Sequence, residues 1–308
     1  MCQLLNDPKL AALIAQLPVL SGASNISILG GGLTNKNYKV ETTNGICVMR
    51  VSDTAPALLG INRENEKINS QKAFEAGVGP AVIDALLQQG VLLVDWIDAK
   101  TLHPADLHGN TILLQRIAAS LQMLHASHTF AGKFHFPSLR KTYLDTVLKN
   151  NYFIPAAYLD TEPLITALED AIAANPEPLV SCNNDLLAEN FMDDGKKIWI
   201  IDYEYSGMNE ASFEIGNLSS ESNLAAADIR TLCDAYWQQH RPEKIARAKA
   251  WSMIARYGWM MWASIQSAVS TIDFDFKTWG IQKWESVLPE LTSDEYHLIL
   301  RTIKQTHS

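Results

Sequence analysis

Residues 181–190 read Ser-Cys-Asn-Asn-Asp-Leu-Leu-Ala-Glu-Asn, and a short apolar run, 198–201, then leads into Asp202-Tyr-Glu-Tyr205. Asp185, Asn190 and Asp202 have the types and order of a phosphoryl-transfer centre. In such a centre one acid orients a hydroxyl and accepts its proton, while the amide and the second acid hold Mg²⁺ against ATP phosphates. Mg²⁺ prefers oxygen ligands, usually one or two from protein with phosphates and water. Asp-x4-Asn alone is a weak signal, but with the strand-terminal acid it predicts a kinase.

The composition is that of an ordinary globular protein. Of the 308 residues 47% are hydrophobic and 19% charged, which is enough apolar material for two lobes with their own cores. The formal net charge of −9 argues against a nucleic-acid-binding protein, which needs a basic surface. The same charge is compatible with a cationic substrate.

Neither cysteine spacing nor hydropathy points to export or to a membrane. The cysteines lack metal-ligand or disulfide spacing, which indicates reduced thiols: they are Cys2, Cys47, Cys182 and Cys233. The N-terminal residues lack the basic and apolar regions of a signal peptide. The best candidate span, 251–269, carries Arg256 and several polar residues. We therefore expect a cytoplasmic protein without membrane insertion.

The first hundred residues predict a small antiparallel sheet. A short amphipathic helix is expected over 5–17. Residues 25–51 alternate apolar and polar positions around an Asn44-Gly45 turn, the strongest short-range hairpin signal. A helix over 61–76 and two strand-like runs, near 81–85 and 91–96, complete this part.

Beyond residue 98 the patterns are mainly helical. Residues 104–126 carry apolar positions at i, i+3 and i+4, and further helices are expected over 138–174, 211–269 and 293–305. A strand pair around 190–201 interrupts them. The predicted fold class is α+β, with a small antiparallel-sheet N-lobe that contains one helix, residues 1–97, and a larger mostly helical C-lobe, residues 98–308.

Three glycines, residues 30–32, separate the first two predicted strands. A glycine backbone can approach phosphates closely with its N–H groups directed at them, although a plain hairpin turn explains a glycine triplet equally well. Thr34 and Asn35 add polar groups at the turn and favour a ligand. The loop lacks the lysine of a Walker site.

Arg50 ends the third predicted strand among apolar neighbours and is expected to point inward. A guanidinium in that position can bridge the α and β phosphates; the alternative is a surface arginine on an edge strand. A buried cation needs an acidic partner, and the next helix offers Glu64 and Glu66. Two residues apart on a helix, they cannot both face the site. We favour Glu66.

Six of the eight tryptophans fall between residues 237 and 284, and two of them, Trp259 and Trp262, share one helix face. An aromatic stripe at this spacing is more often core. The alternative is a box for a quaternary ammonium group, to which each ring contributes roughly 0.5–2 kcal/mol. Tyr205 adds a ring beside the predicted metal centre, and Glu221 offers a negative charge for a cation.

Together these motifs resemble the choline/ethanolamine kinase family, in the protein-kinase-like superfamily that also holds aminoglycoside phosphotransferases. The resemblance covers about residues 25–280 and rests on the segments 31–38, 62–66, 79–80, 184–190, 201–206 and 213–217, with Arg50, Glu221 and Trp259-x-x-Trp262. The glycine loop and Asp-x4-Asn occur across the superfamily. The segment 202–221 with Trp-x-x-Trp is more specific to the choline-type branch.

The resemblance implies a bilobal protein-kinase-like fold and an ATP:choline phosphotransferase that uses ATP and Mg²⁺. Asp185 would act as the base, and Asn190 and Asp202 would bind Mg²⁺. The nucleotide contacts would come from Thr34, Asn35, Arg50 paired with Glu66, and backbone groups near Asp95–Ile97. The trimethylammonium group would be boxed by Tyr205, Trp259, Trp262 and Trp279, with Glu221 as counter-charge.

Two positions depart from the family pattern. Asn183 stands where the family usually has a His two residues before the catalytic Asp; that His supports the loop, so an Asn can replace it or can leave a slower or inactive enzyme. Glu214 replaces the usual Asp of Phe-Asp-x-Gly-Asn and is one methylene longer. His125 is expected to be a hydrogen-bonding residue at a helix end.

The acceptor is expected to be small, because only twelve residues separate Asp202 from Ile215, without an Ala-Pro-Glu signal, and so no activation segment is present on which a peptide could lie. Choline is the leading substrate. Ethanolamine, thiamine or an aminoglycoside remains open, as does a non-catalytic cation-binding protein, which Asn183 suggests. Either a monomer or a homodimer is compatible with the sequence.

Overall fold

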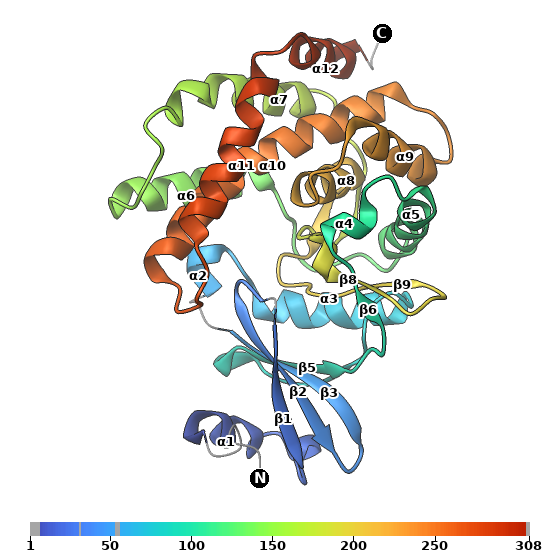
Figure 1. Cartoon of the computed structure of the whole chain (residues 1–308), viewed down its shortest axis with the longest axis vertical. Coiled ribbons are helices and arrows are strands. Elements are labelled where there is room, and N and C mark those ends of the chain that lie inside the picture. The colour runs from blue at the N-terminus through green and yellow to red at the C-terminus, as the bar shows by residue number, and fades with distance from the viewer. Residues whose placement is uncertain (1–6, 31, 53–55, 306–308) are drawn as a thin grey trace.

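The computed structural model describes residues 7–30, 32–52 and 56–305. A small sheet lies at the N-terminal end of the molecule and a larger helical part at the other (Figure 1). Cys2, Gly31 and the start of the helix expected over 5–17 lie outside the described residues. The rest of that helix is present as α1, Pro8–Ile14, followed by a 3₁₀ turn, η2, Pro18–Leu20.

Five antiparallel strands form the sheet, in the order β1-β2-β3-β5-β4. Helices α2, Pro56–Leu59, and α3, Arg63–Glu75, lie between β3 and β4 in the chain, and the 3₁₀ turn η3, Leu87–Gln89, precedes β5. The strands are β1, Asn25–Leu29; β2, Asn35–Thr42; β3, Gly45–Ser52; β4, Val82–Leu86; and β5, Val91–Asp95.

The predicted β2–β3 hairpin is present, with its turn one residue earlier than expected. Thr42 pairs with Gly45, so Thr43 and Asn44 form the connection. The Thr42 hydroxyl donates to the Gly45 carbonyl and accepts the Asn44 N–H, at 3.1 Å each, which fixes this register. Gly45 has φ of +136°, a backbone conformation that glycine adopts readily.

The sheet buries one face under the N-terminal helix and presents Arg50 on the other. Leu10 and Leu13 of α1 pack in one cluster with Val40, Met49 and Leu93. Because side chains alternate along a strand, Arg50 next to Met49 points away from this layer. The side chain of Arg50 is 10% exposed and faces the acidic residues of the helical part.

The helical part begins after β5. Its helices are α4, Pro104–Leu107; α5, Thr111–His125; α6, Phe136–Lys149; α7, Glu162–Ala173; α8, Ala211–Glu221; α9, Ala226–Trp237; α10, Pro242–Val269; α11, Phe276–Leu291; and α12, Asp294–Lys304. Short strands and 3₁₀ turns lie between them: β6, Lys100–Thr101; η4, Leu159–Thr161; β7, Leu179–Cys182; η5, Ala188–Asn190; β8, Phe191–Asp193; β9, Ile198–Ile200; and β10, Gly207–Glu210.

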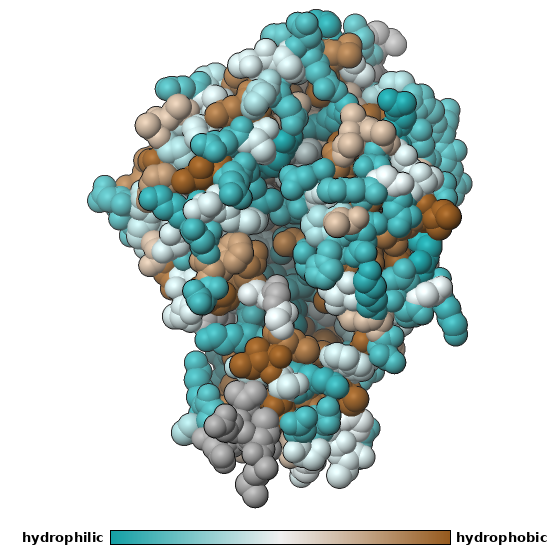
Figure 2. Space-filling view, in the orientation of Figure 1, coloured by the Kyte–Doolittle hydropathy of each residue, from teal (hydrophilic) through white to brown (hydrophobic). Residues whose placement is uncertain are grey.

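Helix α10 is the centre of the helical part and packs against α6, α7, α8, α11 and α12. The helix expected over 104–126 is divided into α4 and α5, since Gly109 has φ of +66° and Asn110 caps α5. The face seen in Figure 2 is mostly hydrophilic with separate hydrophobic patches. Within the described ranges no helix combines the length and apolarity needed to cross a bilayer.

The segment between β3 and β4 joins the two parts. Leu59 and Ile61 pack in the core around α10, and Ala73 and Val78 pack in a second core with α5 and α9. The hydrophobic cores therefore cross the boundary predicted at residues 97 and 98. That boundary stays a prediction.

A buried ion pair and an exposed ion pair in the helical part allow a test of how much burial contributes to stability. Arg140 of α6 is fully buried, and its guanidinium donates to both oxygens of Glu169 on α7, at 2.6 and 2.8 Å. Arg140 also binds the carboxylate of Glu162 at 2.9 Å. We expect Glu169→Ala to lower the free energy of unfolding by about 2 kcal/mol, because the buried guanidinium loses two charged hydrogen bonds and keeps only Glu162 as its acidic partner. The control is Glu295→Ala, which removes the exposed partner of Lys249 and is expected to cost less than about 1 kcal/mol. Equal losses in urea denaturation would contradict this account.

Candidate active site

The loop that carries Asp185 is fixed by Asn183. The side-chain oxygen of Asn183, Oδ1, accepts the backbone N–H of Asp185 at 3.0 Å. Its amide nitrogen donates to the backbone oxygens of Asp202, at 2.8 Å, and Ile201, at 3.2 Å. One buried amide therefore ties together the two segments that supply the predicted catalytic and metal-binding acids, which is the supporting role expected at this position.

Glu214 of α8 binds the backbone of the same loop, which carries Asp185. Its two carboxylate oxygens accept the N–H groups of Asn183, at 3.0 Å, and Asn184, at 2.9 Å. His125, the last residue of α5, lies 3.0 Å from Glu214 and 2.7 Å from the Tyr236 hydroxyl. The extra methylene of Glu214 is thus accommodated, and the expectation that His125 is a hydrogen-bonding residue at a helix end is confirmed.

The two acids and the amide of the predicted centre, Asp185, Asp202 and Asn190, lie near one another. The Asn190 side-chain nitrogen donates to the Asp185 carbonyl at 2.6 Å, which orients that amide. Asp202 has φ of +64°, an unusual conformation for a residue other than glycine and of the kind that functional sites retain. Asp185 and Asp202 are close enough for the charge of one to act on the other.

Arg50 connects the sheet to this centre. Its guanidinium binds Glu66 at 2.9 Å and Asp202 at 2.6 Å, and lies 3.9 Å from Glu204. Arg63 bridges Glu66, at 2.6 Å, and Glu204, at 3.2 Å. The choice of Glu66 over Glu64 as the partner of Arg50 is therefore confirmed. A role of Arg50 toward ATP stays a prediction.

The glycine loop is held down by Glu204. Its oxygens accept the Thr34 hydroxyl at 2.5 Å and the Asn35 amide at 3.0 Å. A side chain on Gly32 would place its Cβ 2.2 Å from the Asn35 carbonyl oxygen, so only glycine fits there. The Leu33 carbonyl accepts the Gln266 amide at 3.1 Å. The polar residues predicted to cover phosphates thus face the acids of the helical part.

Negative charge exceeds positive charge in this centre. Burial raises the pKa of Asp185 well above its ordinary value, and ionised Asp202, Glu204 and Glu221 add to the shift. Burial, Glu204 and Glu66 also raise the pKa of Asp202 to about 6, although Arg50 and Arg63 oppose the shift. Carboxylate and amide oxygens with uncompensated charge are the donor set that Mg²⁺ prefers. Asn190 and Asp202 therefore fit a Mg²⁺ site.

The segment predicted to hold adenine ends β5. The Asp95 N–H already donates to the Ala81 carbonyl at 2.9 Å, and the Trp96 N–H to the Ile46 carbonyl at 3.4 Å. These two groups are engaged in the sheet. The groups of this segment that remain as predicted adenine contacts are the Ile97 N–H and the backbone carbonyl oxygens, since one carbonyl oxygen can accept more than one hydrogen bond.

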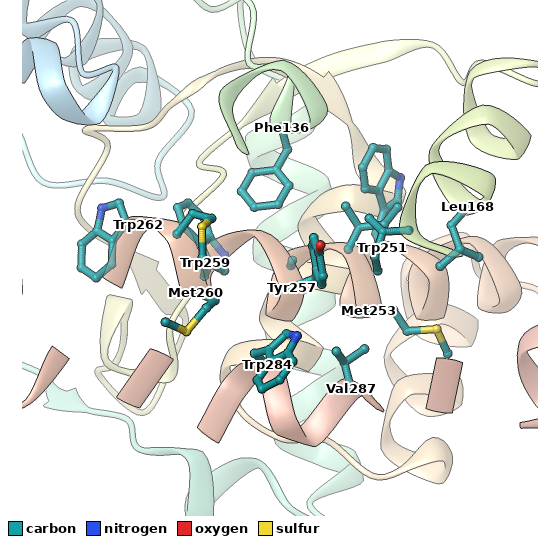
Figure 3. Packing of buried hydrophobic residues seen from close by; sticks show 14 of the residues in the cluster. Phe136, Leu168, Trp251, Met253, Tyr257, Trp259, Met260, Trp262, Trp284 and Val287 are labelled. Carbon is teal, nitrogen blue, oxygen red and sulfur yellow. The ribbon is translucent and has the colours of Figure 1, made fainter. Parts of the chain in front are cut away.

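The four rings of the predicted aromatic box contact one another in series, and three of them, Tyr205, Trp259 and Trp262, also belong to the core around α10. Trp259 and Trp262 lie along α10, and Trp259 faces Phe136 (Figure 3). Both are 5% exposed or less. The Trp262 indole donates to the Tyr205 hydroxyl at 3.0 Å, and the rings of Trp262 and Trp279 are 5.6 Å apart, edge to face. Tyr205 therefore links the tryptophan pair to the segment of Asp202.

Glu221, predicted as the counter-charge of a substrate cation, already has a partner. Its Oε2 accepts the Lys283 ammonium at 2.7 Å. That ammonium also lies 4.5 Å from the ring centroid of Trp279. The Lys283 ammonium group therefore already contacts the carboxylate and one of the rings that were predicted to bind a substrate cation.

Comparison with known proteins agrees with this geometry. A model of the choline/ethanolamine kinase family matches residues 26–244. The chain belongs to that family. Two relatives of this kinase family are ethanolamine kinase 2 of Mus musculus, 27% identical over 86% of this chain and 76% of that protein, and protein LicA of Haemophilus influenzae, 29% identical over 77% of this chain and 72% of that protein.

Solved structures place this kinase in the protein-kinase-like fold that was predicted. A choline/ethanolamine kinase family protein from Mesorhizobium loti superposes with a TM-score of 0.84 at 28% identity, over 96% of this chain and 98% of that chain. Choline kinase LicA from Streptococcus pneumoniae gives 0.78 at 24% identity, over 91% and 98%. The aminoglycoside phosphotransferase APH(4)-Ia gives a TM-score of 0.65 at 14% identity, over 94% of this chain and 99% of that chain, which supports the fold alone.

Sequence reasoning missed three charged residues of this kinase site. Glu204 lies two positions after Asp202 and contacts both arginines and the glycine loop. Arg63 lies three positions before Glu66 on α3, and Lys283 four positions after Trp279 on α11. Helical spacing of three or four puts such pairs on one face, and that signal was present in the sequence.

The excess of negative charge predicts that ionised Asp185 lowers the stability of the folded protein at neutral pH. Because the folded-state pKa of Asp185 is raised, the folded protein loses stability as pH rises from about 4 through that pKa. We expect Asp185→Asn to increase the free energy of unfolding in EDTA at pH 8 by about 1–2 kcal/mol, and to give no gain at pH 4.

The control is the exposed Asp98→Asn, whose stability should stay within about 0.5 kcal/mol of the wild type at both pH values. If Asp185→Asn instead lowers the free energy of unfolding at pH 8, ionised Asp185 does not destabilise the folded protein, and the account of excess negative charge is wrong.

Proposed function

We propose that this member of the family is an ATP- and Mg²⁺-dependent kinase that transfers the γ-phosphoryl group to the hydroxyl of choline. The observation that supports this most is the convergence of Asp185, Asn190 and Asp202, with Arg50 at one side and the rings that begin at Tyr205 at the other. The first set suits phosphates, and the second suits a methylated cation.

Asp185 orients the alcohol and accepts its proton. Its raised pKa makes its carboxylate a better proton acceptor than an exposed aspartate, provided that it is ionised. When bound, Mg²⁺ neutralises phosphate charge, and Asn190 and Asp202 would hold it. Asn183 and Glu214 keep these side chains in position by bonding to the backbone of both loops.

In the nucleotide half of the site, ATP phosphates would replace carboxylates of the protein as partners of the same donor groups. In this structure the cationic and polar groups of the sheet bind carboxylates: Arg50 binds Glu66 and Asp202, and Thr34 and Asn35 bind Glu204. Phosphate oxygens are acceptors for the same donors. ATP therefore competes with resident acids, and Mg²⁺ compensates the acids that it releases.

The amine half favours a methylated nitrogen. A trimethylammonium group has no N–H to donate and gains mainly from ring faces, whereas a primary ammonium needs hydrogen-bond acceptors. The predicted box consists of Tyr205, Trp259, Trp262 and Trp279, and its carboxylate, Glu221, is bonded to Lys283. Relatives named for choline and for ethanolamine both exist, so ethanolamine is the second candidate.

The first test is the acceptor dependence of ATP consumption. We expect Mg²⁺-dependent release of ADP to require choline, with kcat/KM for ethanolamine lower by about tenfold because the rings favour methylated nitrogen. A coupled assay with choline, ethanolamine, thiamine and kanamycin measures this. ADP release at the same rate with and without each amine would contradict the proposal. Tight choline binding without turnover would instead indicate a non-catalytic protein.

The second test concerns the ring nearest the surface. Trp279 is half-buried, whereas Trp259 is 4% exposed and packs against Phe136 at 4.8 Å, so truncation of Trp259 would also damage the core. We expect Trp279→Ala to raise KM for choline about tenfold and KM for ethanolamine about twofold, since a lost cation–π contact matters more to the methylated cation.

Trp237→Ala is the matched control. Trp237 is also half-buried and has Lys244 over its ring at 5.6 Å, but it lies on α9. It should leave both KM values within about twofold, as for other changes away from the site. Equal effects of Trp279→Ala on the two amines would contradict the box.

A further inference from the structure

The ammonium group of Lys283 occupies the position that the proposed amine site offers to its substrate. It is bonded to Glu221 at 2.7 Å and lies 4.5 Å from the centroid of Trp279. The side chains of Lys283 and Glu221 are only 11% and 5% exposed. A carboxylate and a ring face are the two features that bind an ammonium ion, and here both contact a lysine.

This pair also lies beside the catalytic residue. The charges of Glu221 and Lys283 both act on Asp185, the first raising its pKa and the second lowering it. The pair comes from two helices, with Glu221 at the end of α8 and Lys283 in α11 one turn after Trp279. The second oxygen of Glu221, Oε1, is buried and has no hydrogen-bond partner among the described residues.

We propose that Lys283 sets the selectivity of the amine site, by holding the carboxylate that a primary ammonium group would otherwise use. This inference rests on the proposed function. While Lys283 is bonded to Glu221, the carboxylate charge is balanced, and a second cation gains little from it. The amine then depends on ring faces, which favour methylated nitrogen.

Removal of the lysine charge changes this balance in one direction. Without Lys283 a primary ammonium can donate short, charge-assisted hydrogen bonds to both oxygens of Glu221. A trimethylammonium group has no N–H and gains only the weaker attraction of an unscreened charge. The gain is therefore larger for ethanolamine than for choline.

The experiment measures choline and ethanolamine binding by calorimetry without ATP, and KM for both in the ADP-release assay, for wild type and Lys283→Met. We expect ethanolamine to bind Lys283→Met about tenfold more tightly than wild type, the value of one charged hydrogen bond, and choline affinity to change by less than about threefold. Glu221→Gln in the Lys283→Met background should cancel the ethanolamine gain.

Two further variants separate selectivity from structure. Lys283→Arg keeps a cation beside Glu221 and should restore the wild-type preference to within about twofold. Lys277→Met removes an exposed lysine of the same helix, which lies over Phe153 at 4.2 Å, and should leave both affinities unchanged. If Lys283→Met does not fold, Lys283→Gln replaces it, because its amide can still donate to the carboxylate without a charge.

Equal gains for both amines, no gain, or a loss of ethanolamine binding would each overturn the inference. The proposed function fails separately, when wild-type ADP release shows no dependence on either amine. A wild-type protein that phosphorylates choline while Lys283→Met keeps the same preference overturns the role of Lys283 alone.

Discussion

The contact on which the site depends is the guanidinium of Arg50 between the carboxylates of Glu66 and Asp202. It joins the central strand of the sheet, helix α3 and the segment after β9, three elements far apart in the sequence. Because the two terminal nitrogens of one planar guanidinium bind different carboxylates, this contact fixes direction as well as distance. The face of the sheet that carries Arg50 therefore has one defined position relative to Asp202 and Glu66.

The same network concentrates negative charge in the centre, which is consistent with the proposed binding of Mg²⁺ and ATP phosphates there. Three carboxylates, those of Glu66, Asp202 and Glu204, share two arginines, and the pKa of Asp202 is raised to about 6 even with both arginines beside it. Positive φ at Asp202 adds local strain. Such features lower the stability of the empty protein, and a protein retains them where a ligand compensates for them.

In the proposed amine site, the side chains that would bind the substrate also belong to the core. Trp259 and Trp262 belong to the core around α10, yet they reach Tyr205 through ring contacts and one hydrogen bond. The helical spacing of such a tryptophan stripe suits a core and a binding site equally well, so the spacing alone cannot decide between the two interpretations. Lys283 shows that charge compensation from a third helix enters the same space.

The sequence by itself determined the α+β class, the β2–β3 hairpin, the family and the partnership of Arg50 with Glu66, because local periodicity and short motifs encode them. It left open what Glu204, Arg63 and Lys283 contact, since those partners are up to 170 residues away. Only the tertiary structure decided them: a charge chooses its partner by distance in space, and burial, which no single residue reveals, sets how strongly the two interact.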